Sequence, residues 1–309
     1  MGFASLFAGK MLGDGYLNRT RRACRFAFLH SLSDKDYAQY CLDLFAKYLP
    51  FGSSEVKLES CFDSRSQKVY HRVFCQSRTS AVLDELYPLW YRGRKVIPIE
   101  WVDENLDVDG LAIWYQDDGH LKEGGCRIIL SADSFSEREK AFLCLLLLNK
   151  FNIKSSVDCQ GRLDISSRLE VRKFQALVEP LVHPSMGRKT IVDKWQLWAV
   201  QWAECKVPDR GICRTSIYLP YELYEVMRGS GYSSLLNRLL GEWLEKQWAV
   251  ICSDSAQRYR WLVEHTGVAR GEYMITPRFW PDVKTKLDLL SLATGFERSE
   301  LVTIALMGL

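Results

Sequence analysis

The stretch Leu6–Leu17 reads LFAGKMLGDGYL, a run of small and apolar residues that ends in an Asp-Gly pair at Asp14. A second stretch, Leu111–Leu121, reads LAIWYQDDGHL and ends in the same pair at Asp118. Both have the spacing of an apolar helix that stops at a turn. Superposing Asp14 on Asp118 gives an offset of 104 residues, so the chain carries a candidate internal repeat.

The segments that follow each stretch repeat as well. Amphipathic runs at 33–49 and 136–151 each begin with a Ser cap and acids in the first turn, where the helix dipole favours them. A further helical run follows Arg78 in the first copy and Arg168 in the second. The offsets shrink along the chain, which predicts shorter loops in the second copy.

Alternating segments rich in β-branched and aromatic residues lie between these helices and predict strands. They include residues 25–29, 69–74, 127–130 and 162–165. Each half therefore predicts the order helix, two strands, helix, two strands, helix. The segment 96–108, which contains Pro98, joins the halves.

These features resemble the single-chain LAGLIDADG homing endonucleases, in which two copies of a motif make a pseudo-dimer. The resemblance covers residues 3–192, and Asp14 and Asp118 match the last acid of the family motif. It implies an α+β fold with two αββαββα halves, whose curved antiparallel sheets form a saddle over DNA, and a monomeric protein. Ile113 stands where the first motif has Gly9, so the packing of the two motif helices must be asymmetric.

The motif has a physical reason that can be stated from its residues. Ala8, Gly9 and Gly13 put small surfaces on one helical face, so a second helix can approach closely and bring Asp14 and Asp118 together. Two converging carboxylates repel each other unless a cation lies between them. Oxygen ligands suit Mg²⁺, or another divalent cation such as Mn²⁺ or Ca²⁺. Two such ions could activate the attacking water and stabilise the leaving oxygen of a phosphodiester displacement.

Three other charged residues are candidates for the same site. Asp117 precedes Asp118, and we expect it to cap a helix or face solvent rather than bind metal. Lys95 and Lys189 each end a Gly-Arg-Lys triplet, at equivalent places of the two halves. The resemblance implies that they activate water or steady the phosphate. The alternative is a surface lysine after a helix end, where the dipole favours cations.

Basic residues are concentrated in the first half. Residues 15–33 and 64–83 contain no acid and eight Lys or Arg, more than the chain's net charge of +3. This pattern indicates a phosphate-binding surface, with a plain solvated face as the alternative. The resemblance implies that alternate side chains of the strands reach base edges in the major groove. The candidates are Arg19, Arg21, Arg22, Arg25, Arg65, Lys68, His71, Arg72 and Arg78 in the first half, and Lys122, Arg127, Lys154, Arg162 and Arg168 in the second.

The last hundred residues predict a mainly helical domain. Trp195, Trp198 and Trp202 recur at helical spacing, and core packing is expected of them. The region 213–309 resembles two ribbon-helix-helix DNA-binding units in tandem, with a generic helical tail as the alternative. Its predicted strands are 214–219 and 274–279, and its predicted helices start at 220, 235, 281 and 300. The strands would pair as a ribbon that enters a major groove, although Pro277 removes a ladder donor. The outward residues expected are Arg214, Ser216, Tyr218, Met274, Thr276 and Arg278.

The predicted segments are therefore residues 1–103 and 104–192 as the two halves, 193–212 as a connecting helix and linker, and 213–309 as the additional DNA-binding domain. The predicted function is a Mg²⁺-dependent endonuclease that cuts both strands of a specific double-stranded DNA site. An intron RNA maturase is an alternative, because a basic saddle serves either nucleic acid. A catalytically inactive DNA-binding regulator is another, but the presence of both Asp14 and Asp118 argues against it.

Composition excludes other classes of protein. Hydrophobic residues at 47% and charged residues at 26% are typical of a globular chain. The longest apolar run, Ala141–Leu148, is far shorter than the roughly 20 residues needed to cross a bilayer. The ten cysteines never form Cys-x-x-Cys, which predicts reduced thiols and no zinc site. No secretory signal is recognised, so we expect a cytoplasmic or organelle-matrix protein that is neither secreted nor membrane-bound.

Overall fold

The computed structural model describes residues 2–21, 23–65, 67–205, 211–229 and 231–308. The chain divides into two compact units. The first unit comprises Met1–Ile165 and Leu181–Thr190, and the second comprises Ser166–Pro180 and Ile191–Leu309. Within the described residues, no helix combines the length and the apolar character needed to cross a membrane. Arg22 and residues 206–210 of the predicted linker lie outside the described residues.

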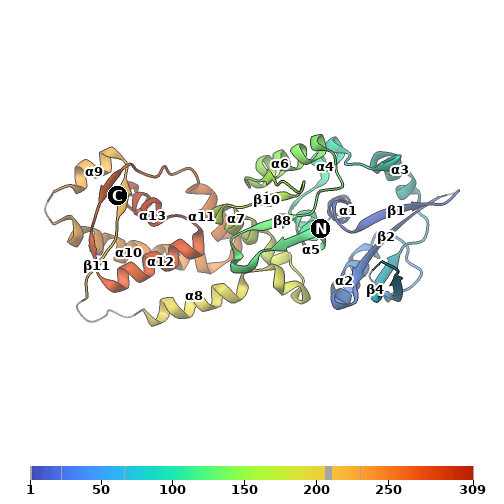
Figure 1. Cartoon of the computed structure of the whole chain (residues 1–309), viewed down its shortest axis with the longest axis horizontal. Helices are drawn as coiled ribbons and strands as arrows, with labels where there is room; N and C mark the ends of the chain where they lie inside the picture. Colours follow the sequence, from blue (N-terminus) through green and yellow to red (C-terminus); the bar gives the residue numbers. More distant parts are fainter. Residues whose placement is uncertain (1, 22, 66, 206–210, 230, 309) are drawn as a thin grey trace. The chain divides into compact units, whose positions relative to one another are not determined.

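The first half of the first unit has the predicted order of elements (Figure 1). Its elements are α1 (Phe3–Leu12), β1 (Gly15–Arg19), β2 (Cys24–Ser31), η1 (Leu32–Asp34), α2 (Lys35–Phe45), β3 (Lys57–Asp63), β4 (Lys68–Gln76) and α3 (Ala81–Trp90). The strands form an antiparallel sheet in the order β1-β2-β4-β3. A hairpin of β5 (Tyr91–Arg92) and β6 (Arg94–Lys95) and the helix α4 (Ile99–Asn105) lead to the second half.

The second half repeats this order with shorter strands. Its elements are α5 (Val108–Asp118), β7 (Gly119–Leu121), η2 (Glu123–Gly125), β8 (Ile128–Leu130), α6 (Glu137–Phe151), β9 (Ser156–Val157), β10 (Leu163–Ile165), α7 (Arg168–Val178), η3 (Glu179–Leu181) and η4 (Pro184–Lys189). The sheet order β7-β8-β10-β9 is equivalent to that of the first half. Ser136 caps α6 and forms a capping box with Glu139, as the Ser followed by acids predicts. The predicted α+β fold with two four-stranded antiparallel sheets is therefore confirmed.

The two motif helices, α1 and α5, pack against each other (Figure 1). The approach is so close that a Cβ added at Gly9 would lie 2.0 Å from the carbonyl oxygen of Gly110. The Ser5 hydroxyl accepts the Gly110 N–H at 3.1 Å and so joins the same crossing. Ile113 is the residue of α5 that is equivalent to Gly9 in the repeat. The small residue that α5 contributes to this crossing is instead Gly110. The asymmetric packing expected from Ile113 is what the helices show.

The core of the first half lies on the helix-facing side of its sheet. Phe26 and Phe28 of β2 are fully buried. The centre of the Phe26 ring lies 5.2 Å from that of Phe7 on α1 and 4.9 Å from that of Phe45 on α2, with the rings tilted. Because side chains alternate along a strand, the residues between them belong to the opposite face. That face is the surface which the saddle interpretation assigns to DNA.

The second unit is mainly helical, with two short paired segments. Its elements besides α7 are α8 (Val192–Glu204), β11 (Cys213–Arg214), β12 (Ile217–Leu219), α9 (Tyr221–Met227), α10 (Tyr232–Ser253), α11 (Ser255–Glu264), β13 (Tyr273–Ile275), β14 (Arg278–Phe279), α12 (Pro281–Thr294) and α13 (Arg298–Met307). β11 pairs with β14 and β12 with β13, antiparallel and in one continuous register. The helix predicted to start at residue 235 starts at Tyr232 instead, as α10, which has 22 residues. The helix α11 was not predicted.

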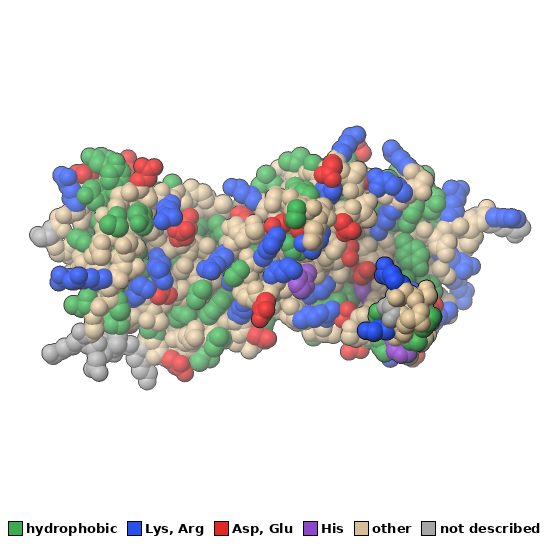
Figure 2. Space-filling view, viewed as in Figure 1, with side chains coloured by type: hydrophobic (Ala, Val, Ile, Leu, Met, Phe, Trp, Pro, Cys, Tyr) green, Lys and Arg blue, Asp and Glu red, His purple; other side chains and the backbone are tan. Residues whose placement is uncertain are grey.

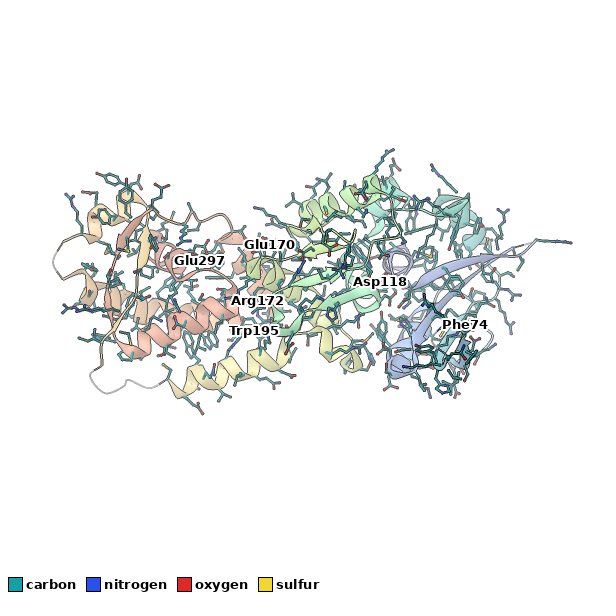
Figure 3. The ribbon with its side chains drawn as sticks, in the orientation of Figure 1. Phe74, Asp118, Glu170, Arg172, Trp195 and Glu297 are labelled. Atoms are coloured by element: carbon teal, nitrogen blue, oxygen red, sulfur yellow. The ribbon has the colours of Figure 1, made fainter. Side chains whose placement is uncertain are left out.

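The helix α7 belongs to the second unit, where it contacts α11 and α12. Its Arg172 guanidinium lies 5.1 Å from the ring of Trp198, and Arg258 of α11 lies 3.9 Å from the ring of Trp195 (Figure 3). All three tryptophans of α8, including Trp202, are buried, which confirms their predicted core packing. The contacts therefore assign α7, the last helix of the second half, to the second unit. The boundaries of the four segments predicted from the sequence stay predictions.

Candidate active site

The two motif acids lie at the ends of the paired helices. Asp14 follows the end of α1, and Asp118 is the last residue of α5 (Figure 3). Burial, together with the charges of Asp117 and Asp118, raises the pKa of Asp14 to about 7, and the charges of Lys10 and Lys189 oppose this shift. Burial and then the charge of Asp117 raise the pKa of Asp118 to about 6. Both carboxylates therefore lack sufficient positive charge around them, and a bound cation would relieve this.

Lys95 lies beside the end of the first motif helix. Its ammonium donates hydrogen bonds to the carbonyl oxygens of Gly13, at 3.2 Å, and Gly15, at 2.8 Å. Burial lowers the pKa of Lys95 to about 8, against the attraction of the nearby carboxylates. Lys95 is therefore a half-buried cation close to the acids, and the role inferred for it stays a prediction.

Lys189 holds the equivalent place at the end of the second motif helix. Its ammonium donates to three carbonyl oxygens of the last turn of α5, those of Tyr115, Gln116 and Asp117. Lys189 is buried, and this burial lowers its pKa. The two Gly-Arg-Lys triplets thus place their lysines at equivalent positions, as the repeat predicts.

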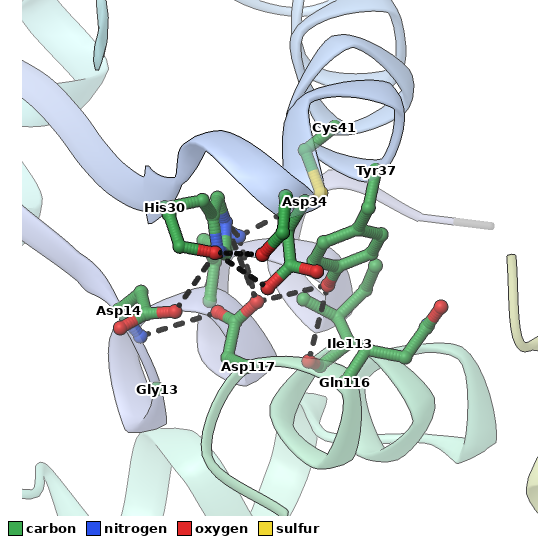
Figure 4. A network of polar contacts seen from close by, with 12 residues as sticks. Gly13, Asp14, His30, Asp34, Tyr37, Cys41, Ile113, Gln116 and Asp117 are labelled. Atoms are coloured by element: carbon green, nitrogen blue, oxygen red, sulfur yellow. Dashed lines mark hydrogen bonds and ion pairs between the residues drawn. The ribbon is translucent and has the colours of Figure 1, made fainter. Parts of the chain in front are cut away.

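The Asp117 side chain neither caps a helix nor faces solvent, the two arrangements that were expected for it. It is 0% exposed, and its Oδ1 accepts hydrogen bonds from the Lys10 ammonium at 2.7 Å and the Tyr37 hydroxyl at 2.9 Å (Figure 4). Its Oδ2 accepts the backbone N–H of Asp14 at 3.2 Å. The prediction of capping or solvent exposure is wrong, because Lys10 supplies a buried cation that the sequence analysis did not consider.

His30 completes this buried cluster and was also missed. Its Nε2 lies 2.7 Å from the Lys10 ammonium, and its Nδ1 lies 3.2 Å from Oδ2 of Asp14 (Figure 4). Burial, and then the charge of Lys10, lowers the pKa of His30 to about 2, so the ring is neutral. The only signal in the sequence was the charged Lys10 inside an otherwise apolar motif helix.

The chemistry of these donors decides where a divalent ion fits. Asp14, His30 and Asp117 each offer a ligand atom within 4.8 Å of the others. However, the Lys10 ammonium already contacts two of these three residues and supplies the positive charge there. Among the described residues, no lysine or arginine forms an ion pair with Asp14 or Asp118, although lysine charges act on both acids from further away. Their half-exposed carboxylate oxygens are the donors that fit Mg²⁺.

Three of the basic candidates of the first half share the outer face of its sheet. Arg25 pairs with Asn18 across β1, and Arg72 pairs with Ser31 across β2. Lys68 shares the face of Arg72, because the two residues are an even number of positions apart on β4. These residues are exposed or half-exposed on the side away from the core.

Two candidates lie on the helix-facing side of the same sheet instead. The Arg19 guanidinium lies 5.0 Å from the ring of Tyr87 on α3. His71 shares its face with the buried Val73 and contacts Ser60 at 3.0 Å. The alternation of the strand therefore excludes Arg19 and His71 from the outer face, and the sequence reasoning placed them wrongly.

The remaining candidates of the first half lie outside its strands. Arg21 and Arg65 are exposed in loops between strands, and Arg78 is exposed in the loop before α3. Arg22 lies outside the described residues. These loop residues are compatible with phosphate contacts but have no strand register that would direct them to base edges.

The basic candidates of the second half are more often paired with acids. Arg127 makes two hydrogen bonds of 2.8 Å to Asp164, and Arg162 makes bonds of 2.9 and 2.6 Å to Asp158. Arg168 begins α7 and so belongs to the second unit. Lys122 and Lys154 are exposed. In the face seen in Figure 2, Lys and Arg side chains are interspersed with Asp and Glu.

The outer faces also carry polar side chains that the sequence analysis missed. They are Tyr16 and Asn18 on β1, Tyr70 and Gln76 on β4, and His120 on β7. The short strands β1 and β7 follow the motif helices directly, and neither has enough alternation to be recognised alone. Once the register is fixed, the alternation of each strand identifies these residues.

The paired strands of the second unit present the side chains that were expected. Ile217, Leu219, Ile275 and Phe279 are buried, while Arg214, Ser216, Met274, Thr276 and Arg278 are exposed and Tyr218 is half-buried. Arg214 lies directly opposite Arg278 in the register. Like charges at directly opposed positions destabilise a strand pair unless an anion is near.

The comparisons with known proteins agree with this geometry. A family model described as "LAGLIDADG DNA endonuclease family" matches residues 4–177, more than half of the chain. The chain belongs to this family. The expectation drawn from the repeated motif is thereby confirmed at the level of the family, whereas the ribbon-helix-helix resemblance of the second unit stays a prediction.

Relatives in the LAGLIDADG family include both maturases and endonucleases. The chain is 27% identical over 203 residues to the cytochrome b mRNA maturase bI2 of Saccharomyces cerevisiae, and the match covers 61% of this chain and 47% of the relative. It is 29% identical over 138 residues to the intron-encoded endonuclease ai4 of Dictyostelium discoideum, covering 43% of this chain and 84% of the relative. The chain thus spans about half the length of the yeast maturase.

A solved homing endonuclease structure shows the same fold. The homing endonuclease I-WcaI bound to its DNA recognition sequence matches with a TM-score of 0.52 and 22% identity, covering 60% of this chain and 84% of that chain. At this identity the likeness supports the architecture and leaves the chemistry to be argued from the residues.

Proposed function

We propose that this LAGLIDADG chain is a site-specific homing endonuclease that hydrolyses both strands of a double-stranded DNA target with Mg²⁺. The observation that carries the proposal is the meeting of Asp14 and Asp118 at the ends of two closely packed helices, with the half-buried Lys95 and the buried Lys189 beside them. A catalytically inactive protein would have no need for this arrangement. Its two uncompensated carboxylates are costly for the fold and useful only with a cation.

The residues have distinct roles in this proposal. Asp14 and Asp118 would hold divalent ions, which when bound supply an activated water and charge for the departing oxygen, with each acid serving the cut of one strand. Lys95 and Lys189 keep positive charge beside the acids, and their hydrogen bonds to the helix ends fix their ammonium groups. Such fixed charges stabilise developing negative charge on phosphate better than mobile ones.

The DNA surface of the first unit is proposed on the outer faces of its two sheets. Arg25, Lys68 and Arg72 are the best placed basic residues, with Arg21, Arg65, Arg78, Lys122 and Lys154 as candidates for backbone phosphates. Arg127 and Arg162 would have to exchange Asp164 and Asp158 for DNA. In the second unit, Arg214, Ser216, Tyr218, Thr276 and Arg278 form the proposed ribbon contact.

The test is cleavage of DNA from an intron-lacking homing site in the presence of Mg²⁺, followed by mapping of the ends. Double-strand cuts at one position with short 3′ overhangs are expected. EDTA should abolish them, and the double variant Asp14→Asn/Asp118→Asn is the control for a contaminating nuclease. Cutting that is equally fast in EDTA or with this variant would contradict the proposal.

A second candidate function, an intron RNA maturase, is favoured by one specific finding. The yeast relative at 27% identity is a cytochrome b mRNA maturase. Maturase activity would need RNA binding but neither Asp14 nor Asp118. Splicing of the cognate intron that persists in the Asp14→Asn/Asp118→Asn variant, without DNA cleavage by the unsubstituted chain, would replace the endonuclease proposal by this one.

A further inference from the structure

Lys10 is a buried cation within an apolar helix. Its side chain is 0% exposed, and its ammonium contacts His30 Nε2 and Asp117 Oδ1, each at 2.7 Å, and Cys41 Sγ at 3.6 Å. It also lies 4.5 Å from the centre of the Phe28 ring. A buried ammonium is tolerated only when paired and hydrogen-bonded, and here each of its three N–H groups has an acceptor. The arrangement is therefore built around this charge.

The position of the Lys10 ammonium determines the tautomer of His30. A lysine ammonium can only donate, so the Nε2 atom that faces it must accept. The proton of the neutral ring is then on Nδ1, which lies 3.2 Å from Oδ2 of Asp14 (Figure 4). The Nδ1 side of the His30 ring is thus in polar contact with the carboxylate of Asp14.

Asp117 holds the same residue from a second side. Its Oδ2 accepts the backbone N–H of Asp14, while its Oδ1 accepts from Lys10 and from Tyr37. Lys10 is therefore bonded both to the group that orients the Asp14 carboxylate and to the group that fixes its backbone. We call Lys10, His30, Asp117 and Tyr37 the Lys10 cluster.

The second half has no equivalent of this cluster. Trp114 stands at the motif position of Lys10, and Gly13 of the first motif stands at the position of Asp117. The sheet registers, Gly15 with Phe28 and Gly119 with Leu130, place Ala132 where the first half has His30. His30 Nδ1 lies 3.2 Å from the carboxylate of Asp14, whereas no ion pair to the carboxylate of Asp118 is found among the described residues. The two motif acids are therefore held in different ways.

We propose that Lys10 and His30 are positioning residues for Asp14, and that through them the cuts of the two DNA strands become chemically unequal. The proposal rests on the proposed endonuclease function. The cut that depends on Asp14 requires a carboxylate held by the Lys10 cluster, whereas the cut that depends on Asp118 does not. Loss of a polar contact that supports a metal-binding side chain typically costs 10- to 100-fold in activity.

The first experiment measures both strands on a supercoiled plasmid with one target site. The variant His30→Leu should slow the cut of one strand by roughly 10- to 100-fold, so that nicked circles accumulate before linear DNA. End-labelling of each strand should assign the nick to the same strand in every molecule. His30→Asn, which keeps an N–H donor near the place of Nδ1, should recover part of the lost rate.

A merely structural role of His30 predicts a different result. A destabilised protein loses active molecules, and both strand cuts then slow by the same factor with no excess of nicked circles. Equal slowing of both strands, or equal rates for His30→Leu and the unsubstituted chain, would overturn the proposal while leaving the endonuclease function intact.

The second experiment does not depend on cleavage. Nitrogen NMR of histidine-labelled protein without metal should show His30 as a neutral ring with its proton on Nδ1, assigned by its absence in His30→Leu. The variant Lys10→Met should release this tautomer. A His30 protonated on Nε2 in the unsubstituted chain would overturn the proposal, even if no DNA were cut and the endonuclease function had failed.

Discussion

At the residue scale, the site separates two kinds of acid that look alike in the sequence. Asp117 and Asp118 are neighbours, yet Asp117 forms an ion pair of 2.7 Å with the buried Lys10, whereas no lysine or arginine of the described residues forms an ion pair with Asp118. The Lys10 ammonium thus makes Asp117 a poorer candidate for a metal ligand than Asp118. The same reasoning leaves Asp14 and Asp118 as the pair on which catalysis should depend.

The first prediction follows from this division. Asp14→Asn or Asp118→Asn should abolish double-strand cleavage, because an amide lacks the negative charge that holds the divalent ion. DNA affinity, measured by gel shift, should stay within a few-fold, since most of the affinity comes from contacts to the DNA backbone. Full cleavage by either variant would remove that acid from the active site.

The same substitutions should have the opposite effect on stability. Burial and the charge of Asp117 raise the pKa of both acids, so their ionised forms at pH 8 destabilise the metal-free fold. In EDTA at pH 8, Asp14→Asn should raise the melting temperature. The free energy of unfolding should increase by the roughly 0.5–2 kcal/mol typical of single stabilising changes. Mg²⁺ should stabilise the unsubstituted protein more than the variant. A lower melting temperature for the variant in EDTA would show that the carboxylate is not under strain.

At the element scale, the crossing of α1 and α5 brings the acids together. Gly9 is placed against Gly110, and a Cβ added at Gly13 would lie 2.5 Å from the Cβ of Asp117. Neither glycine is needed for its backbone angles, because both lie where the two helices touch. The distance between the helix ends, and hence between the acids, depends on these small residues.

A prediction for this crossing uses Gly9→Ala. Alanine favours a helix by about 1 kcal/mol over glycine, but overpacking of a close contact costs roughly 1–3 kcal/mol or more. The free energy of unfolding in urea should therefore fall. Gly241→Ala in α10 is the matched control, because nothing lies within 4 Å of its added Cβ and it should stabilise instead. Equal stabilisation by both substitutions would mean that the helices do not approach so closely.

The ribbon of β11, β12, β13 and β14 provides a prediction for the second unit. Arg214→Ala/Arg278→Ala in the full chain should weaken DNA binding and lower its salt dependence, because fewer counterions are released. It should also shorten the protected footprint on one side. Arg260→Ala on α11, another exposed arginine, is the control. Unchanged affinity, salt slope and footprint would make this unit a structural tail or a contact for another partner.

At the scale of the whole molecule, one chain supplies both motif helices and both sheets of the first unit. We expect the protein to bind its DNA as a monomer of 35.7 kDa. Light scattering or analytical ultracentrifugation of the complex measures this directly. A stable dimer with one motif helix from each chain at the cleavage centre would contradict it. Truncation after Glu204 is unsuitable as a test, because it would remove the partners of α7 in the second unit.

The sequence by itself determined the repeat, the order of the elements and the positions of Asp14, Asp118, Lys95 and Lys189. These depend on local signals, namely apolar periodicity, Ser caps and Asp-Gly or Gly-Arg-Lys ends that recur in both halves. Such signals depend on a few neighbouring residues. Because the chain contains a repeat, each signal occurs in both halves, and the two occurrences support each other.

Only the tertiary structure decided which acids are free to bind metal and which side chains face outward. Lys10 and Asp117 are 107 residues apart in the chain, so no local pattern shows that one neutralises the other. Likewise, Arg19 and His71 could be placed on the helix-facing side only after the strand registers were known. Burial, which sets the charge state of each group, comes from packing between distant segments, and that information is absent from local periodicity.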